Sequence, residues 1–256
     1  IGVRLVGSEM CIRDSPRSGL DVDISLDNRL AIYNSMLMKS YAQEKRLQQL
    51  VQMVKYWASR RGVNNAFEGT LSSYAWTLLC IQHAQLVQPP LAPNRQHENA
   101  SKPISFLGTT YDVGFNDDAY ASKNAQTLAS LLISFFDRFA TRWDWDSMVV
   151  SIRSGNPLST KEKKWQQTGP LPLEVVTGAE DGMMAHVMPI EDPFDHDHDL
   201  SRVLRAEGAM SIQNEFMRAI QLISEGASWQ TICEPVIDID EAVSYTHLTL
   251  PTILLV

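Results

Sequence analysis

Two aspartates near the start of the chain could bind a metal ion. Asp21 and Asp23 lie in the stretch LDVDISLDN, from Leu20 to Asn28, which reads as a short strand. Residues i and i+2 share one face of a strand, and two carboxylates on one face are a common way of binding a catalytic metal. Two interpretations stay open: a complete metal-binding pair, or one part of a site whose other carboxylates lie elsewhere.

A second acidic stretch, DPFDHDHD from Asp192 to Asp199, also combines carboxylates with histidines. Both side-chain types are good metal ligands. In an extended segment, however, ligands at alternate positions do not converge on one ion without a turn. A metal site is therefore the weaker interpretation of this stretch.

Composition limits the classes of function. The 256 residues are 44% hydrophobic and 20% charged, which is typical of one or two globular domains. A net charge of −8 disfavours nonspecific binding of nucleic acid, so any RNA or nucleotide contact requires a local basic patch. Three widely spaced cysteines predict reduced, buried thiols in an intracellular protein. No apolar run reaches the length of a membrane span.

The elements that must position these residues are mostly helical, which predicts an α+β fold that is mostly α. Apolar residues at helical spacing, caps and prolines predict five helices: Arg29–Gln43, Glu44–Arg61, one capped by Ser72 or Ser73 and ended by Pro89-Pro90, Leu128–Phe139 and Ser211–Ser224. Three short strands are predicted at Gly19–Leu26, Met148–Ile152 and Ala185–Ile190, with loops at Pro89–Pro103 and Thr168–Gly182.

The two ends resemble translations of the adaptor DNA used in transposase-based sequencing libraries. The start contains LVGSEMCIRDS and the end contains VSYTHLTLPT. The string ATG TGT ATA AGA GAC AG encodes MCIRDS with one further base, and its reverse complement contains codons for VSYTH. One inverted repeat can thus generate both ends. We expect residues 1–15 and 243–256 to be adaptor-derived and exclude them from fold reasoning.

Five blocks of the remaining sequence resemble one enzyme family, in the family's own order. They are DISLDNRLAIYNS (Asp23–Ser35), VKYWASRRGVN (Val54–Asn64), GTLSSYAW (Gly69–Trp76), SLLISFFDRFATRWDWDSMVVSIRSG (Ser130–Gly155) and IEDPFDHDHDLSRVL (Ile190–Leu204). The family is that of terminal uridylyltransferases and non-canonical poly(A) polymerases, which are DNA polymerase beta-like nucleotidyltransferases. The resemblance implies a residual palm strand at residues 16–27 and a helical central domain at residues 28–242. A poly(A)-polymerase-associated segment would lie at about residues 125–200 of that domain.

The resemblance also answers the question about the aspartates. In this family the Asp-x-Asp metal pair lies upstream, and a third aspartate is followed by Asn at +5 and Asn at +11, here Asp23, Asn28 and Asn34. Asp23 is thus the implied catalytic residue and ligand of Mg²⁺ or Mn²⁺, whereas Asp21 matches no role. Gly7-Ser8 before Asp21 and Asp23 imitates the Gly-Ser signature that precedes the metal pair, but it falls in the adaptor-like start. We therefore expect this chain by itself to be an inactive fragment.

The remaining implied site residues bind the nucleotide. Asn28 would meet the base edge, and Asn34 with Ser35 the ribose hydroxyls; Ser35 stands where the family usually has Thr. Lys55 and Ser73 would bind the triphosphate, and Tyr74 would stack on the base. A second family lysine is replaced by Ser59, with Arg60 or Arg61 as candidates to take over its contact. Base selection is implied for Asp192, Asp195 and His198, and His198 would exclude the bulkier purine. His196 has no assigned role, and Asp199 replaces a common Asn.

The implied activity is addition of UMP from UTP to RNA 3′ ends. The implied partners are an RNA 3′ end and UTP or ATP, with neither membrane nor DNA, and the expected location is the cytoplasm, with nucleus and mitochondrion left open. A non-canonical poly(A) polymerase and a catalytically dead relative that only binds RNA or a partner are the alternatives. Ordinary structural roles also remain open for these residues. Asn28 and Asn34 would cap or turn a helix start, and Ser73 would be a plain N-cap. Lys55 would be a solvated lysine on a helix face, and Tyr74 a core aromatic.

Overall fold

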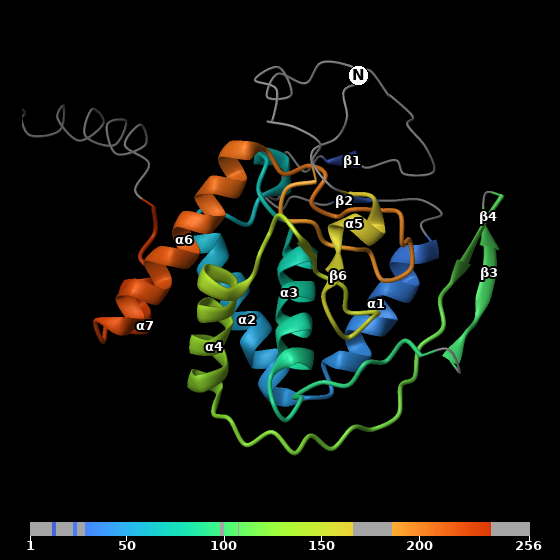
Figure 1. Cartoon of the computed structure of the whole chain (residues 1–256), viewed down its shortest axis with the longest axis horizontal. Helices are drawn as coiled ribbons and strands as arrows, with labels where there is room; N and C mark the ends of the chain where they lie inside the picture. The colour runs from blue at the N-terminus through green and yellow to red at the C-terminus, as the bar shows by residue number, and fades with distance from the viewer. Residues whose placement is uncertain are drawn as a thin grey trace, which may run out of the picture.

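The computed structural model describes residues 12–13, 23–24, 29–97, 100–106, 108–165 and 186–236. The predicted α+β, mostly helical class is confirmed (Figure 1). The long helices are α1 (Arg29–Tyr41), α2 (Lys45–Arg60), α3 (Ser73–Leu86), α4 (Leu128–Asp137) and α6 (Ala206–Ser224). Shorter turns of helix are η1 (Ala66–Glu68), the π-helix η3 (Arg138–Arg142), α5 (Thr160–Lys163) and α7 (Trp229–Ile232).

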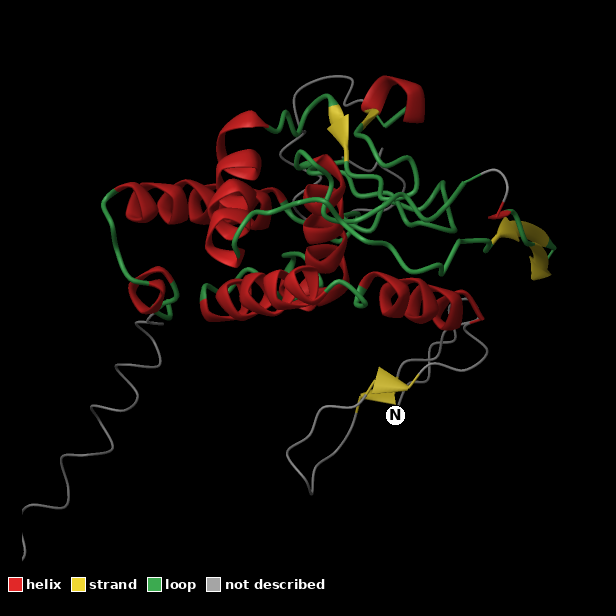
Figure 2. Cartoon of the chain, turned by 90° about the horizontal axis from the view of Figure 1, so that it is seen from below, coloured by secondary structure: helices red, strands yellow, loops and turns green. Residues whose placement is uncertain are grey.

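The strands form three separate antiparallel pairs. They are β1 (Ile12–Arg13) with β2 (Asp23–Ile24), β3 (Pro103–Phe106) with β4 (Thr109–Asp112), and β5 (Met148–Val149) with β6 (Leu158–Ser159). The β3–β4 hairpin projects from the side of the molecule away from α6 and α7 (Figure 2). β1 lies in the adaptor-like start of the chain. None of the described helices is long and apolar enough to cross a bilayer.

The core is an aromatic cluster shared by four helices. It consists of Trp57 on α2, Trp76 on α3, Phe136 on α4 and Phe216 on α6, all fully buried. The Trp57 ring centroid lies 4.8 Å from that of Phe136, 5.6 Å from that of Trp76 and 5.7 Å from that of Phe216. Ring pairs at such distances add about 0.5–1.5 kcal/mol each beyond the burial of their area. The cluster therefore fixes how α2, α3, α4 and α6 pack.

A buried histidine joins α3 to the end of α4. Arg138 Nε donates to His83 Nδ1 at 3.0 Å. Because a guanidinium cannot accept, the imidazole proton lies on Nε2, which donates to Ser134 Oγ at 3.1 Å. Burial and the Arg138 charge lower the pKa of His83 to about 3, so the imidazole is neutral.

The start of α6 lies directly against the loop before α3. Arg205 N donates to Gly69 O at 3.0 Å, and a Cβ at Gly208 would lie 2.0 Å from the same Gly69 oxygen. Gly69 itself has a φ of +86°, which favours glycine. Glycines at these two positions thus let α6 approach the GTLSSYAW segment that leads into α3.

Several predicted boundaries differ from the structure. Ser72, not Ser73, is the N-cap of α3, and its hydroxyl accepts from Ala75 N. The predicted strand Ala185–Ile190 is wrong over its described residues, because there only Ile190 pairs, in an isolated parallel bridge with Val150. The helix predicted from Ser211 begins at Ala206, and the β3–β4 hairpin was not predicted. The predicted loop Thr168–Gly182 lies outside the described residues.

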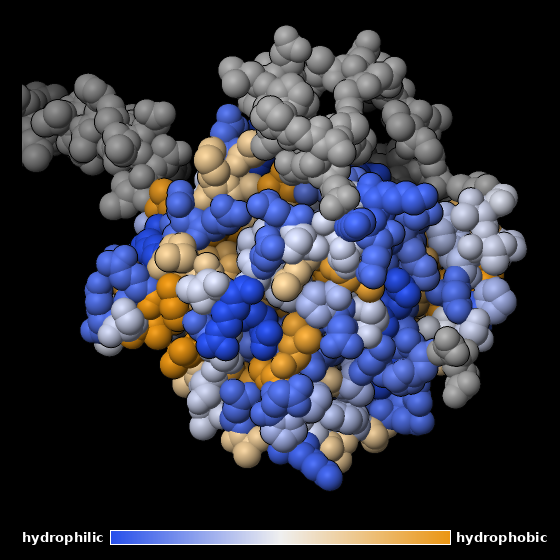
Figure 3. All heavy atoms as spheres, viewed as in Figure 1, coloured by the Kyte–Doolittle hydropathy of each residue, from blue (hydrophilic) through white to orange (hydrophobic). Residues whose placement is uncertain are grey.

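Apolar side chains interrupt the hydrophilic surface on the side where α4, α6 and α7 lie (Figure 3). Exposed apolar residues on these helices are Ile133 on α4 and Met210 and Met217 on α6, each about half exposed. Scattered residues of this kind are ordinary for a globular surface.

Candidate nucleotide-binding site

The structure brings together three of the predicted site residues from distant parts of the chain. Asn34 lies on α1, Tyr74 in the first turn of α3, and Asp192 just after the bridge residue Ile190. Asn34 Nδ2 donates to Asp192 Oδ2 at 3.4 Å, across a sequence separation of 158 residues. Burial and, less strongly, the nearby Asp192 charge raise the pKa of Tyr74.

Two polar atoms of this cluster are buried without a hydrogen-bond partner in the part of the chain that the structure describes. Asn34 Oδ1 and Tyr74 Oη have no hydrogen bond to any described residue. A buried polar atom left unpaired costs about 1–3 kcal/mol, and such atoms in a native protein need an explanation. A ligand that supplies donors and acceptors to α1 and α3 would provide the missing partners.

The loop of residues 192–198 is closed by its own backbone and by Asp192. Asp192 Oδ1 accepts from Phe194 N at 2.9 Å and from Asp195 N at 3.0 Å. Asp192 N donates to His198 O at 3.0 Å, and His198 N donates to Asp195 O at 2.9 Å. Asp195 and His198 are half-buried in this turn. The loop thus holds His198 next to the Asn34–Tyr74–Asp192 cluster through backbone contacts.

The residues predicted for the phosphates lie on α2 and at the start of α3. Lys55 is half-buried on α2, and Ser73 is exposed, with its hydroxyl exchanging hydrogen bonds with the Asn64 amide at 3.0 and 3.2 Å. The first amides of a helix have no intrahelical acceptor and favour an anion. Ser35 is exposed on α1, where its hydroxyl donates to Ala31 O at 2.8 Å.

Arg60 and Arg61 were candidates for a second phosphate contact, but both face the C-terminal part of the chain. Arg61 forms a two-bond ion pair with Glu215 of α6, at 2.8 Å from Nε and 2.7 Å from Nη2. Arg60 Nε donates to Cys233 O at 3.4 Å. Because the Arg61 guanidinium is committed to a carboxylate, it is a poor phosphate ligand.

Asp23 lies on β2, and its side chain, like Asn28, lies outside what the structure describes. Among the described residues, no group of three or more His, Cys, Asp or Glu is placed to bind a metal ion. In the Asp192–Asp199 stretch the carboxylates of Asp192 and Asp199 instead accept backbone amides, with Asp199 Oδ1 bonded to Ile190 N at 3.0 Å and to Ser201 N at 2.9 Å. This stretch therefore shapes a loop rather than a metal site.

Sequence reasoning missed the ion cluster that precedes this loop. Glu191 is buried, and its carboxylate accepts from Arg153 Nη2 at 2.9 Å, Lys163 Nζ at 3.0 Å and Ser151 Oγ at 2.5 Å. Burial alone would raise the pKa of Glu191, but the hydrogen bonds from Arg153 and Ser151 hold it below its usual value. The available signal in the sequence was Glu191 itself, an acidic residue directly before the predicted base-selecting residue Asp192.

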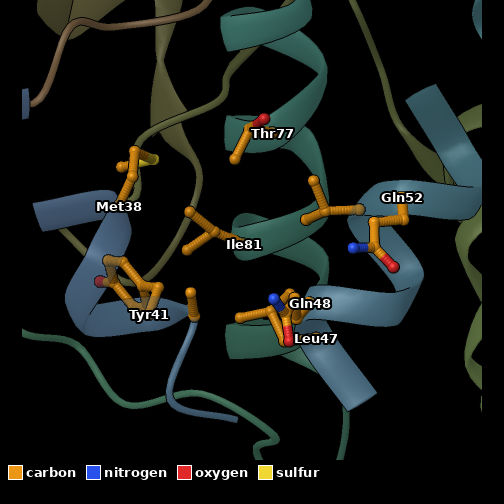
Figure 4. A pocket seen from close by; sticks show the side chains of 9 residues that line it. Met38, Tyr41, Leu47, Gln48, Gln52, Thr77 and Ile81 are labelled. Atoms are coloured by element: carbon orange, nitrogen blue, oxygen red, sulfur yellow. The ribbon is translucent and has the colours of Figure 1, made fainter. Parts of the chain in front are cut away.

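A separate cavity of about 180 Å³ lies between α1, α2 and α3 (Figure 4). Its lining residues are Met38, Tyr41, Ala42, Leu47, Gln48, Val51, Gln52, Thr77 and Ile81. No cationic side chain is among them, and none of the predicted site residues is either. A lining of this kind does not suit a nucleoside triphosphate, so the cavity is distinct from the candidate site.

Comparison with known proteins indicates the same enzyme family as the five sequence blocks. Residues 127–198 match the family described as Cid1 family poly A polymerase. The terminal uridylyltransferase cid1 of Schizosaccharomyces pombe is 34% identical over 209 residues, which are 79% of this chain and 50% of that protein. The poly(A) RNA polymerase GLD2-A of Xenopus laevis is 29% identical over 209 residues, 79% of this chain and 37% of that protein.

Solved structures agree. A cytoplasmic RNA terminal U-transferase superposes with a TM-score of 0.72 at 31% identity, over 86% of this chain and 67% of that one. The Cid1 poly(U) polymerase gives a TM-score of 0.73 at 30% identity, over 88% and 68%. The fold and the sequence thus resemble those of RNA terminal nucleotidyltransferases. The chain belongs to the Cid1 family, which confirms the predicted resemblance. It spans half or less of the curated relatives it matches.

Proposed function

We propose that this chain supplies the nucleotide-binding part of an RNA 3′-terminal uridylyltransferase, which adds UMP from UTP to RNA 3′ ends. The observation that carries the proposal is the meeting of Asn34, Tyr74 and Asp192, where two buried polar atoms have no hydrogen-bond partner among the described residues. A uridine nucleotide offers both donors and acceptors to such a cluster. The name of the relative cid1, a terminal uridylyltransferase, supports the choice of UTP.

Each residue has a defined part in binding. Tyr74 would stack its ring on the base, because an aromatic face accepts any base. Asn34 and Ser35 would hold the ribose hydroxyls, and Asn28 the base edge. Lys55 and Ser73 would bind the phosphates, Lys55 as a point charge and Ser73 through the helix start.

The base-selecting part of the site would be Asp192, Asp195 and His198. His198 is held by backbone hydrogen bonds at both its N–H and its C=O. These bonds fix the position of the backbone from which the imidazole extends. A side chain fixed in this way can exclude the larger purine by steric clash, and exclusion of the wrong ligand is a source of specificity.

Catalysis by this family is metal-dependent, and a Mg-bound structure of the Cid1 poly(U) polymerase is among the structural relatives. Mg²⁺ or Mn²⁺ would neutralise the triphosphate and favour attack by the RNA 3′-hydroxyl. On this chain Asp23 is the residue proposed to bind the metal, together with an upstream Asp-x-Asp pair. The proposed partners are an RNA 3′ end and UTP, without DNA or membrane, and the proposed location is the cytoplasm.

A poly(A) polymerase is the second candidate, because GLD2-A and cid13 are also relatives. The experiment uses a protein in which this chain follows a palm that carries its own Asp-x-Asp pair. Extension of a labelled RNA should be faster with UTP than with ATP. In His198→Ala the UTP/ATP ratio of kcat/KM should fall about tenfold, or roughly 1.4 kcal/mol of discrimination.

The matched control is His97→Ala, which removes an exposed histidine outside the 192–198 loop. Its ratio should equal that of the parent. A parent that prefers ATP, or a His198→Ala ratio equal to that of His97→Ala, would favour the poly(A) polymerase. No extension with any nucleotide would favour the catalytically dead relative.

A further inference from the structure

The side chain of Lys163 reaches from α5 to the 192–198 loop. Lys163 Nζ donates to Glu191 Oε1 at 3.0 Å and also to the carbonyl oxygen of His196. It lies 4.5 Å from the ring centroid of Trp165, a distance at which a cation is attracted to an aromatic face. The side chain is 13% exposed, so these contacts are largely shielded from water.

The other partners of Glu191 act on a different part of the chain. Arg153 holds Glu191 by two hydrogen bonds, at 2.9 and 3.2 Å, and Ser151 adds a third. Arg153 and Ser151 both follow β5, so they tie Glu191 to that segment. Lys163 joins the same carboxylate to the middle of the 192–198 loop. It can therefore be removed while Glu191 keeps a cationic partner.

The His196 carbonyl lies two residues before His198, in the same tight turn. His198 N is bonded to Asp195 O, and His198 O accepts from Asp192 N. The turn can therefore shift as a unit if its contact with Lys163 is lost. A displacement of His198 by a fraction of an ångström would change how closely a base can approach.

We propose that Lys163 is a positioning residue for base selection, which fixes the 192–198 turn so that His198 excludes a purine. This inference rests on the proposed function. It assigns part of the specificity to a side chain on α5 that belongs to none of the predicted nucleotide contacts. Lys163 acts through the His196 carbonyl and the Glu191 carboxylate.

The test measures the dissociation constants of UTP and ATP for the full chain by NMR titration, which is suited to weak binding. Lys163→Met keeps the apolar stem beside Trp165 and removes the charge. The ratio Kd(ATP)/Kd(UTP) should fall about fivefold, through tighter binding of ATP as the exclusion is relieved. Lys163→Arg should restore most of the ratio, and Lys163→Gln serves if Lys163→Met does not fold.

Lys161→Met is the matched control, because Lys161 is exposed on the same helix. It should leave the ratio unchanged. In the His198→Ala background, Lys163→Met should cause no further fall, since both changes remove the same exclusion and their effects are coupled. Additive effects of the two changes would overturn the inference. Weaker binding of both nucleotides at an unchanged ratio would overturn it too, since a merely structural role predicts that result.

The single variants separate the two hypotheses. If His198→Ala leaves the ratio unchanged, the proposed preference for uridine fails. If His198→Ala lowers the ratio but Lys163→Met does not, only the role of Lys163 fails. An equal fall in Lys161→Met would mean a general effect of charge and would also overturn that role.

Discussion

The aromatic cluster around Trp57 and the loop from Glu191 to Asp199 are both largely buried, but they are held by different contacts. The cluster packs rings from four helices, and its attraction is non-directional. The loop is held by carboxylates that accept amides and cations at fixed distances. Ring packing fixes how whole helices lie against one another, whereas directional hydrogen bonds fix the positions of individual atoms. A base-selecting site needs directional hydrogen bonds of this type.

The largest expected effect comes from the aromatic cluster. Phe216→Ala should lower the free energy of unfolding by about 4 kcal/mol, because it removes a ring that contacts α2, α3 and α4 and leaves a cavity. Urea unfolding measures this. Met217→Ala, at a neighbouring residue that is 51% exposed, should change the value by less than about 0.5 kcal/mol. Equal effects of the two variants would refute the description of this cluster as the core.

A smaller effect is expected from the ion cluster that precedes the loop. Glu191→Gln should lower the free energy of unfolding by about 2 kcal/mol at neutral pH, because hydrogen bonds to a charged acceptor are lost. The folded-state pKa of Glu191 lies below its unfolded value. The ionised carboxylate therefore stabilises the fold above about pH 4.3, and this contribution disappears as the pH falls through the folded pKa.

The unfolding curves of the parent and of Glu191→Gln should thus differ at pH 7 and converge in acid. Asp197→Asn changes an exposed carboxylate of the same loop and should match the parent at neutral pH. A difference between parent and Glu191→Gln that persists unchanged at low pH would show that burial alone, and not the ion cluster, determines the behaviour of Glu191.

The contrast between apolar helix packing and directional polar contacts also explains which elements could be predicted from the sequence. Apolar residues at helical spacing, such as Leu47, Leu50, Val54 and Trp57, predicted α2 because each helix must bury one face. The start of α6 was predicted at Ser211, whereas the helix begins at Ala206, and the part that was missed contains Gly208. The structure shows that this glycine is needed for the approach to Gly69. The β3–β4 hairpin has strands of only four residues each, and none of these residues is buried, so the alternation in PISF was too short to stand out.

In the site, the resemblance indicated Asn34, Tyr74 and Asp192, but no local pattern could show that they meet. Their contact joins residues 158 positions apart and depends on the tertiary fold. The roles of Arg153, Ser151 and Lys163 were missed for the same reason. Each is an ordinary polar residue in its own segment, and only the position of Glu191 gives it a buried partner.

The most direct test of the account is a map of the NMR signals that shift when UTP is added to the chain. The account predicts shifts at Asn34, Ser35 and Tyr74 and at the backbone amides of residues 192–198, with none at Phe136 or Phe216 in the core. ATP should shift the same signals at higher concentration. Shifts confined to residues that line the apolar cavity, such as Met38 and Ile81, or the absence of shifts at Asn34 and Tyr74 at saturating UTP, would contradict it.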